Sequence, residues 1–149
     1  MKILSDSPAK TKQLGILLAK EILRTADNGP VVIALRGNLG AGKTAFTQGL
    51  AQGLGLKRRI TSPTFVIFRH YRLNNKNHKH LFHVDAYRIK KTSDLIPLNF
   101  KEILSLPQSI ILIEWAEKIK GALPRKTVWL EFRHGRKENE RTVIFKTRG

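Results

Sequence analysis

The stretch Gly37-Asn38-Leu39-Gly40-Ala41-Gly42-Lys43-Thr44 decides the fold class of this chain. A glycine, four further residues and then Gly-Lys-Thr form the phosphate-loop pattern. Its glycines let consecutive backbone N–H groups turn toward an anion, its lysine neutralises phosphate charge, and its threonine hydroxyl is a ligand for Mg²⁺. We therefore predict a nucleoside triphosphate site, with contacts from Gly40, Ala41, Gly42, Lys43, Thr44 and Ala45.

Both flanks of the loop carry the pattern that such a site requires. Residues 31–35 (Val-Val-Ile-Ala-Leu) are a continuous apolar run typical of a buried strand. Beyond the loop, Phe46, Leu50 and Leu54 recur at helical spacing. The order strand, loop, helix directs the N-terminus of the helix at the phosphates. The alternative is a glycine-rich turn that fits the pattern by chance, and such a turn would not need a strand and a helix on its two flanks.

Composition limits the class of protein. A chain of 149 residues with 41% hydrophobic and 26% charged residues indicates a single domain over 1–149. Its longest apolar run is too short to span a bilayer and its N-terminus lacks the apolar core of a signal peptide, so we expect a cytoplasmic protein without membrane association. The absence of cysteine excludes disulfides and thiolate metal ligands.

The charge balance is strongly basic. Twenty-eight lysines and arginines against 11 acidic residues give a net charge of +17, which favours binding to polyanions such as RNA. A lysine-rich solvated surface is an equally good explanation, because the excess is spread along the whole chain.

The remaining periodicities predict an α/β fold, a P-loop NTPase-like mixed sheet with flanking helices and an antiparallel hairpin insertion on the nucleotide-binding core. A first helix should begin at Ser7-Pro8 and end near Asn28-Gly29-Pro30. The other predicted elements are hairpin strands within 65–73 and 80–89, two short helices within 92–104 broken by Pro97, a buried parallel strand over 109–114, a short helix over 115–120, and strands over 127–133 and 142–145.

Two acidic residues compete for the metal. Glu114 ends a run of four aliphatic residues, the form of a buried parallel strand that delivers a carboxylate to its carboxyl end, so it is the first choice for Mg²⁺. Asp85 follows a weaker apolar run and is a candidate for orienting water or metal. For either residue, the alternative is an ordinary strand-end carboxylate that caps the next helix.

Two weaker signals lie between the phosphate loop and Glu114 in the sequence. Thr61, Ser62 and Thr64 are candidates for a switch segment that senses the γ-phosphate, with turn chemistry around Pro63 as the alternative. His78, His80 and His83 could suggest a structural zinc site, but no cysteine or carboxylate cluster completes a ligand set.

Four motifs follow one another along the chain: residues 37–44, Thr61-Ser62-Pro63-Thr64-Phe65, His83-Val84-Asp85-Ala86-Tyr87-Arg88 and Ile113-Glu114-Trp115. In this order and spacing they resemble the TsaE family (formerly YjeE) of bacterial ATPases. The resemblance implies an ATPase required for N6-threonylcarbamoyladenosine (t6A) formation in tRNAs that read codons beginning with A. It implies action with the transferase TsaD and its partner TsaB, contact with tRNA through that complex, and ATP turnover that resets the complex between cycles.

The resemblance also implies residue roles. Lys43 and the loop amides bind the phosphates of ATP, Thr44 and Glu114 hold Mg²⁺, and Asp85 is a second switch-like position near the reaction. Lys43, Asp85 and Glu114 are thus the predicted catalytic residues, with the segment from Thr61 to Thr64 as the switch. Adenine is expected near Thr11 and the strand around Arg133.

Two positions depart from the family pattern, because Asn38 replaces the usual Asp and Ala45 replaces a second Thr. A shift in rate or nucleotide preference is the expected consequence.

Two other functions are alternatives to an ATPase of this family. One is a small P-loop kinase acting on a small molecule, although little chain remains for a lid. A nucleic-acid-binding module would explain the charge but not the phosphate loop and Glu114.

Overall fold

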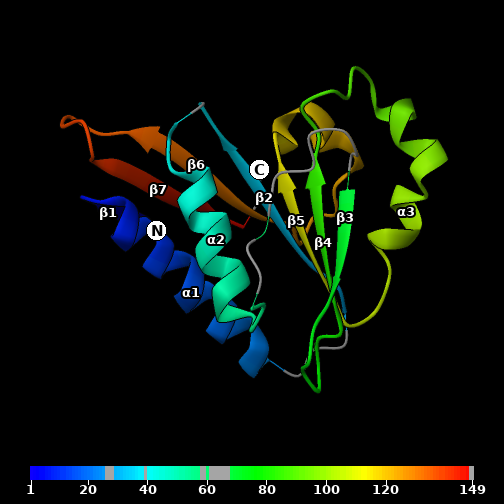
Figure 1. The fold of residues 1–149 in the computed structure, drawn as a ribbon. Helices are drawn as coiled ribbons and strands as arrows, with labels where there is room; N and C mark the ends of the chain where they lie inside the picture. Colours follow the sequence, from blue (N-terminus) through cyan, green and yellow to red (C-terminus); the bar gives the residue numbers. More distant parts are fainter. Residues whose placement is uncertain (26–28, 39, 58–59, 61–67, 148–149) are drawn as a thin grey trace.

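The computed structural model describes residues 1–25, 29–38, 40–57, 60 and 68–147. Its centre is a seven-stranded sheet in the order β1-β7-β6-β2-β5-β4-β3, with helices on both faces (Figure 1). The strands are β1 (Lys2–Ser5), β2 (Val31–Gly37), β3 (Phe68–Arg72), β4 (His80–Asp85), β5 (Ser109–Glu114), β6 (Val128–His134) and β7 (Arg141–Lys146). The predicted mixed α/β fold is confirmed.

The sheet has a parallel centre and antiparallel edges. β2 pairs in parallel with β5 and β6, and β4 pairs in parallel with β5. At the two sides, β6 pairs with β7, β7 with β1, and β4 with β3, all antiparallel. The carboxyl ends of β2, β4 and β5 therefore meet at one edge, where the phosphate loop leaves β2.

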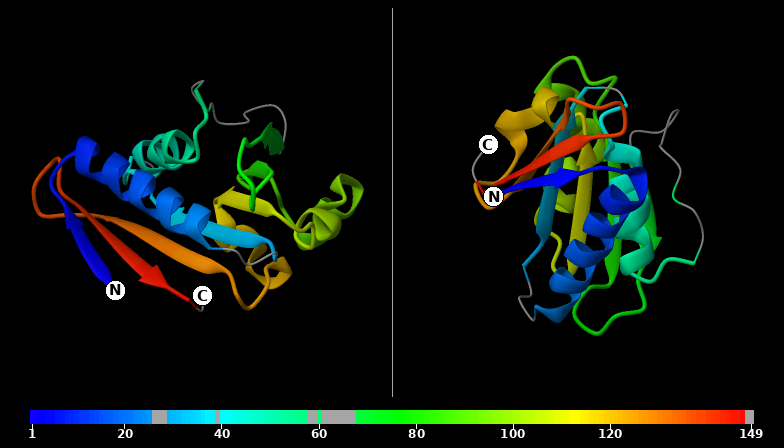
Figure 2. Two further views of the ribbon diagram at one scale, coloured as in Figure 1. Left: turned by 90° about the horizontal axis from the view of Figure 1, so that it is seen from below. Right: turned by 90° about the vertical axis from the view of Figure 1, so that its left-hand side faces the viewer.

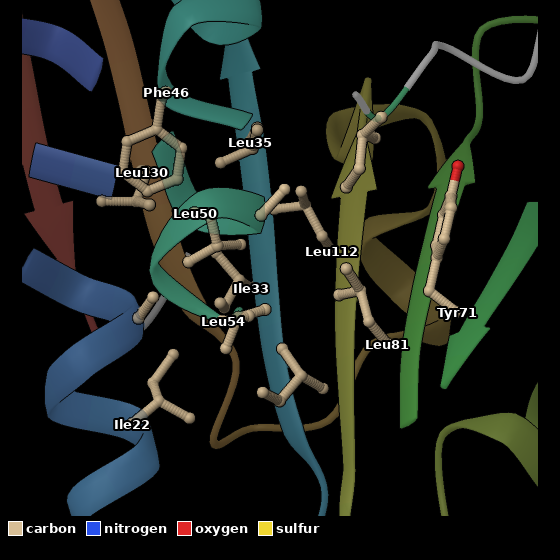
Figure 3. Packing of buried hydrophobic residues seen from close by; sticks show 14 of the residues in the cluster. Ile22, Ile33, Leu35, Phe46, Leu50, Leu54, Tyr71, Leu81, Leu112 and Leu130 are labelled. Atoms are coloured by element: carbon tan, nitrogen blue, oxygen red, sulfur yellow. The ribbon is translucent and has the colours of Figure 1, made fainter. Parts of the chain in front are cut away.

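Helices α1 (Pro8–Arg24) and α2 (Lys43–Gly53) cover one face of the sheet (Figure 2). Phe46 and Leu50 of α2, with Leu54 directly after the helix, pack with Ile33 of β2 and Leu112 of β5 in one apolar cluster (Figure 3). The helical spacing that suggested α2 is thus explained by burial of this side. Helix α2 packs against the sheet on one side and against α1 on another.

Glycines set the distance between α1 and α2. A Cβ at Gly49 would lie 1.9 Å from the carbonyl oxygen of Lys12, and one at Gly15 would lie 2.3 Å from that of Phe46. Real Cβ contacts under 3.0 Å are essentially absent, so only glycine allows the two backbones this close approach.

The opposite face is covered by short helical segments: η1 (Thr92–Leu98), α3 (Phe100–Ile103) and η2 (Ala116–Ala122). Leu95, Phe100 and Ile119 pack there against Val32 and Ile111. Two short helices between 92 and 104 were predicted and are found. Pro97 lies inside the 3₁₀ helix η1, and the direction changes at Asn99, whose φ of 53° is left-handed.

Helix α1 begins where the sequence predicts. The side chain of Ser7 accepts a hydrogen bond from the Lys10 backbone N–H at 3.2 Å, and Pro8 occupies the first turn. The helix ends at Arg24, before the predicted stop, because Thr25 is extended and donates both its N–H and its hydroxyl to the Ile22 carbonyl. Residues 26–28 lie outside the described ranges.

Two features of the sheet differ from expectation. The predicted hairpin exists as β3 and β4, but β4 is also a parallel partner of β5 and so belongs to the central sheet, not to an attachment on it. Strand β1 was not predicted, since its four residues show no clear alternation.

Among the described helices, none has the length and apolar character to cross a bilayer.

Candidate functional site

The loop between β2 and α2 has the backbone that a phosphate cradle requires. Gly42 has φ of 103° and caps α2, and Gly40 has φ of 77°, conformations that L side chains rarely adopt. Inside the loop, the Ala41 N–H donates to the Asn38 carbonyl at 3.1 Å, and Ala41 itself is fully buried. Leu39 lies outside the described residues. The N-terminus of α2 opens directly after the loop, as predicted.

Lys43 is the buried cation of this site, with 7% of its surface exposed. Its Nζ donates to the Gly37 carbonyl at 2.7 Å and lies 4.0 Å from the centroid of the Trp115 ring. Burial lowers the pKa of the Lys43 amine, while nearby carboxylates oppose that shift by favouring the charged form. In order of effect, these carboxylates belong to Glu117, Glu114 and Asp85.

The two predicted acids lie side by side. Asp85 ends β4 and Glu114 ends β5, and the two residues are direct partners in the parallel register. Oδ1 of Asp85 accepts the Tyr87 N–H at 2.9 Å. Oε2 of Glu114 lies 3.0 Å from Nε2 of the buried His83. Two carboxylates at adjacent strand ends, facing one lysine, form the charged centre of the site.

A cavity of about 1110 Å³ opens in front of these groups. The phosphate loop and the start of α2 line it with Gly40, Gly42, Lys43, Thr44 and Ala45, and the strand ends line it with Asp85, Glu114 and Trp115. Helix α1 contributes Pro8, Ala9, Thr11 and Lys12, and the segment between β6 and β7 contributes Asn139 and Arg141. The remaining lining residues are Gln48, Ala51, Gln52, Leu56 and Lys57. The structure therefore gathers most of the predicted site residues around one space large enough for a nucleotide.

Thr11 and Arg133, both predicted from the resemblance, have different positions. Thr11 lines the cavity, and its hydroxyl is 2.8 Å from that of Ser5 on β1. Arg133 does not line it, because alternation along β6 turns this side chain away from the face that Phe132 shares with α2. Its Nε instead donates to Glu131 at 2.6 Å.

Arg141, at the start of β7, is a cavity residue that the sequence analysis missed. Its Nε donates to the Gly40 carbonyl at 3.2 Å, and its Nη1 donates to the carbonyls of Glu138 at 2.6 Å and Glu140 at 2.9 Å. The side chain thereby ties the phosphate loop to the β6–β7 turn. No motif marks this arginine, since only the antiparallel pairing of β7 with β6 brings it near the loop.

The remaining candidates are separated from the cavity or undescribed. Thr61, Ser62 and Thr64 lie outside the described residues, so the switch segment stays a prediction. Of the three histidines, His83 contacts Glu114, His78 lies 3.2 Å from the Thr25 carbonyl, and His80 lies 2.9 Å from His70. Within the described ranges, no cluster of three or more metal-ligating side chains is present.

The donor set suits Mg²⁺. Thr44 and Glu114 both line the cavity, and together they offer a hydroxyl and a carboxylate, the oxygen ligands that this ion prefers. Since Oε2 of Glu114 faces His83, Oε1 is the oxygen that makes no hydrogen bond to any described residue. Phosphate oxygens and water would complete the coordination of the ion.

A strand, a glycine loop with a buried lysine, and two strand-end carboxylates around one cavity define a P-loop α/β domain. Residues 5–143 match the family described as "Threonylcarbamoyl adenosine biosynthesis protein TsaE". The chain belongs to this TsaE family, which confirms the resemblance seen in its motifs.

Individual relatives agree over most of the chain. It is 36% identical over 135 residues to the tRNA threonylcarbamoyladenosine biosynthesis protein TsaE of Treponema pallidum, covering 89% of this chain and 91% of the relative. The protein of the same name from Bacillus subtilis is 35% identical over 139 residues, covering 93% of this chain and 80% of the relative. The crystal structure of Bacillus subtilis YdiB superposes with a TM-score of 0.78 at 30% identity, covering 100% of this chain and 86% of that one.

Proposed function

We propose that this protein is a Mg²⁺-dependent ATP hydrolase that serves t6A formation in tRNA. The observation that carries the proposal is the arrangement of Lys43 in a glycine loop opposite Asp85 and Glu114, at the edge of a parallel sheet. The biosynthetic role rests on relatives named tRNA threonylcarbamoyladenosine biosynthesis protein TsaE, of which this chain covers up to 91%.

Each group has a distinct role in phosphoryl transfer. The loop N–H groups and the Lys43 amine bind the phosphate oxygens, so Lys43 exchanges part of its contact with Gly37 and Trp115 for the triphosphate. Thr44 and Glu114 would hold Mg²⁺, which would supply charge neutralisation to the phosphates. Asp85, one strand away, positions the attacking water.

TsaD and TsaB are the proposed partners, and the cytoplasm is the proposed compartment. None of the phosphate-loop residues 37–44 that contact the triphosphate is an arginine, and Arg141 is already bonded to backbone carbonyls. Hydrolysis by the isolated protein is therefore expected to be slow and to rise in the assembled complex, where an ordered switch segment or a donated cation would add transition-state stabilisation.

In this scheme tRNA is bound through the complex with TsaD and TsaB, and the net charge of +17 supports a direct contribution of this protein to that binding. Contacts to phosphates should be non-specific and should weaken steeply as salt rises. Filter binding of tRNA to the isolated protein over a salt series tests this, and a shallow slope would exclude a phosphate-driven contact.

Release of inorganic phosphate from ATP, measured without any acceptor, is the direct test. Glu114→Gln should retain nucleotide while hydrolysis falls on the order of a hundredfold, because the variant keeps the size of the side chain and loses its charge. Glu21→Gln is the matched control, since the one interaction of the Glu21 side chain within the described part of the chain is an exposed ion pair with Arg24 on α1. Formation of ADP that requires a small-molecule acceptor, with the phosphoryl group recovered on the acceptor and no inorganic phosphate released, would favour a kinase instead.

The two acids are distinguished in the same assay. Asp85→Asn should slow hydrolysis while leaving the Mg²⁺ dependence of nucleotide binding intact, because Asp85 acts on water in this scheme. If Asp85→Asn abolishes the Mg²⁺ dependence and Glu114→Gln does not, the two roles are exchanged. Comparing single-turnover rates with and without TsaD and TsaB then tests whether partners complete the site.

A further inference from the structure

A histidine lies beneath the carboxylates of the site. His83 on β4 is 1% exposed, and its Nε2 is 3.0 Å from Oε2 of Glu114. A carboxylate can only accept, so Nε2 carries the proton and donates it. The other ring nitrogen, Nδ1, is buried and has no hydrogen-bond partner among the described residues. Glu114 is thus the single polar group in the described structure that this ring contacts.

Strand geometry explains how the contact arises. Side chains alternate along β4, so Leu81, His83 and Asp85 face the same side of the sheet. Leu81 packs in the cluster under α2, which identifies this side as the one that carries the cavity (Figure 3). On β5, Leu112 and Glu114 share that side, and Glu114 pairs in register with Asp85. His83 therefore lies one step back from the two acids and reaches Glu114 diagonally.

We infer that His83 is a positioning residue that holds the Glu114 carboxylate in the orientation that binds Mg²⁺. This inference rests on the proposed function. By holding Oε2, the ring fixes the rotation of the carboxylate and leaves Oε1 available in a side chain that lines the cavity together with Thr44. An outer partner that orients a metal ligand in this way commonly affects metal affinity by 10- to 100-fold.

A role in packing alone does not account for this ring. An apolar side chain of similar volume would fill the space between Leu81 and Asp85 without burying two polar nitrogens, one of which is left unpaired. The chain offers a matched comparison in His78, which lies in the hairpin turn before β4 and is 0% exposed. Its Nδ1 is also unpaired, and among the described residues its ring makes one hydrogen bond, from Nε2 to the Thr25 carbonyl.

The test separates nucleotide binding from metal binding. Calorimetric titration of AMP-PNP, an ATP analogue that is not hydrolysed, is carried out in EDTA and again in excess MgCl₂, and the ratio of the two Kd values measures how much Mg²⁺ tightens binding. His83→Leu should leave the Kd in EDTA within about twofold of the wild type and reduce the ratio by about tenfold. His83→Gln should restore most of the ratio, because its side-chain amide can donate from about the position of Nε2.

The outcomes are distinct. His83→Leu with a wild-type ratio, or an equal loss of the ratio in His78→Leu, would overturn the inference and leave the proposed function standing. A wild-type protein that fails to bind AMP-PNP in either buffer would overturn the proposed function, and the inference with it.

A measurement on the unmodified protein covers the case in which His83→Leu does not fold. In ¹⁵N-labelled protein, the side-chain nitrogen shifts of His83 should show the proton on Nε2, and addition of MgCl₂ with AMP-PNP should perturb this resonance while leaving that of His78 in place. A proton on Nδ1 with bare Nε2, or no response of His83, would overturn the inference.

Discussion

Gly49→Ala tests the packing that supports the cavity. A Cβ at this position would lie 1.9 Å from the backbone carbonyl oxygen of Lys12, whereas such contacts are essentially never shorter than 3.0 Å. The helices α1 and α2 must therefore separate by about 1 Å, because a backbone oxygen cannot rotate away as a side chain could. The separation also displaces Thr11, the α1 residue that lines the cavity beside Lys12.

Two opposing terms set the magnitude. Overpacking of this kind costs about 1–3 kcal/mol and sometimes more, and alanine in a helix interior recovers about 1 kcal/mol relative to glycine. Since the clash is with backbone, the upper part of the first range applies, and the net loss should be about 2 kcal/mol. For a domain of 149 residues this lowers Tm by about 4–8 °C.

Urea unfolding followed by circular dichroism measures this difference, and titration with ATP shows whether affinity falls with it. Gly121→Ala is the control, because a Cβ there meets nothing within 4 Å, and its unfolding free energy should stay within about 0.5 kcal/mol of the wild type. A Gly49→Ala protein as stable as Gly121→Ala would show that the helices yield without loss, and the reasoning would be refuted.

Three further substitutions have defined outcomes. Lys43→Met should weaken ATP binding on the order of a hundredfold. Because burial depresses the pKa of Lys43, holding its charge destabilises the free wild type at neutral pH. This cost should diminish in urea unfolding as the pH rises toward 10.5, whereas the variant should lack this pH dependence. Glu131→Gln should lose about 1 kcal/mol at pH 7; the hydrogen bond from Arg133 holds the pKa of Glu131 below 4.5, so the difference should vanish as acidification protonates the wild-type carboxylate. Arg141→Ala removes the bond to the Gly40 carbonyl and should raise the calorimetric Kd for ATP about three- to tenfold, with an unchanged Kd contradicting a role in holding the loop.

The parts of the site that sequence could predict are those written in local patterns. The phosphate loop, its strand and its helix occupy consecutive residues, so spacing alone placed Lys43 and Thr44. Glu114 and Asp85 could each be recognised at the end of an apolar run. Their adjacency could not, because it depends on the register of β4 against β5, which pairs residues 29 positions apart.

Other features depend on pairing across the whole sheet and leave no local signal. Arg141 reaches the loop because β7 returns antiparallel to β6. Arg133 does not line the cavity because its side chain lies on the face of β6 opposite to α2. The contact of His83 with Glu114 likewise requires β4 to lie beside β5. No motif contains Arg141, and the motif that contains His83 does not show which acidic residue the ring contacts.

The position of β5 has a consequence for how the chain folds. This strand lies between β2 and β4, although it follows both of them in the chain, and it pairs Val31 with Ile110 across a long separation. The two earlier strands must remain apart until β5 enters between them, a non-local step that slows folding. On a ribosome that adds 5–20 residues per second, roughly 4–16 s pass between synthesis of these two paired residues. We therefore expect ATP to bind only chains in which β5 has already inserted. The nucleotide would then stabilise the folded sheet after folding is complete and would not initiate folding.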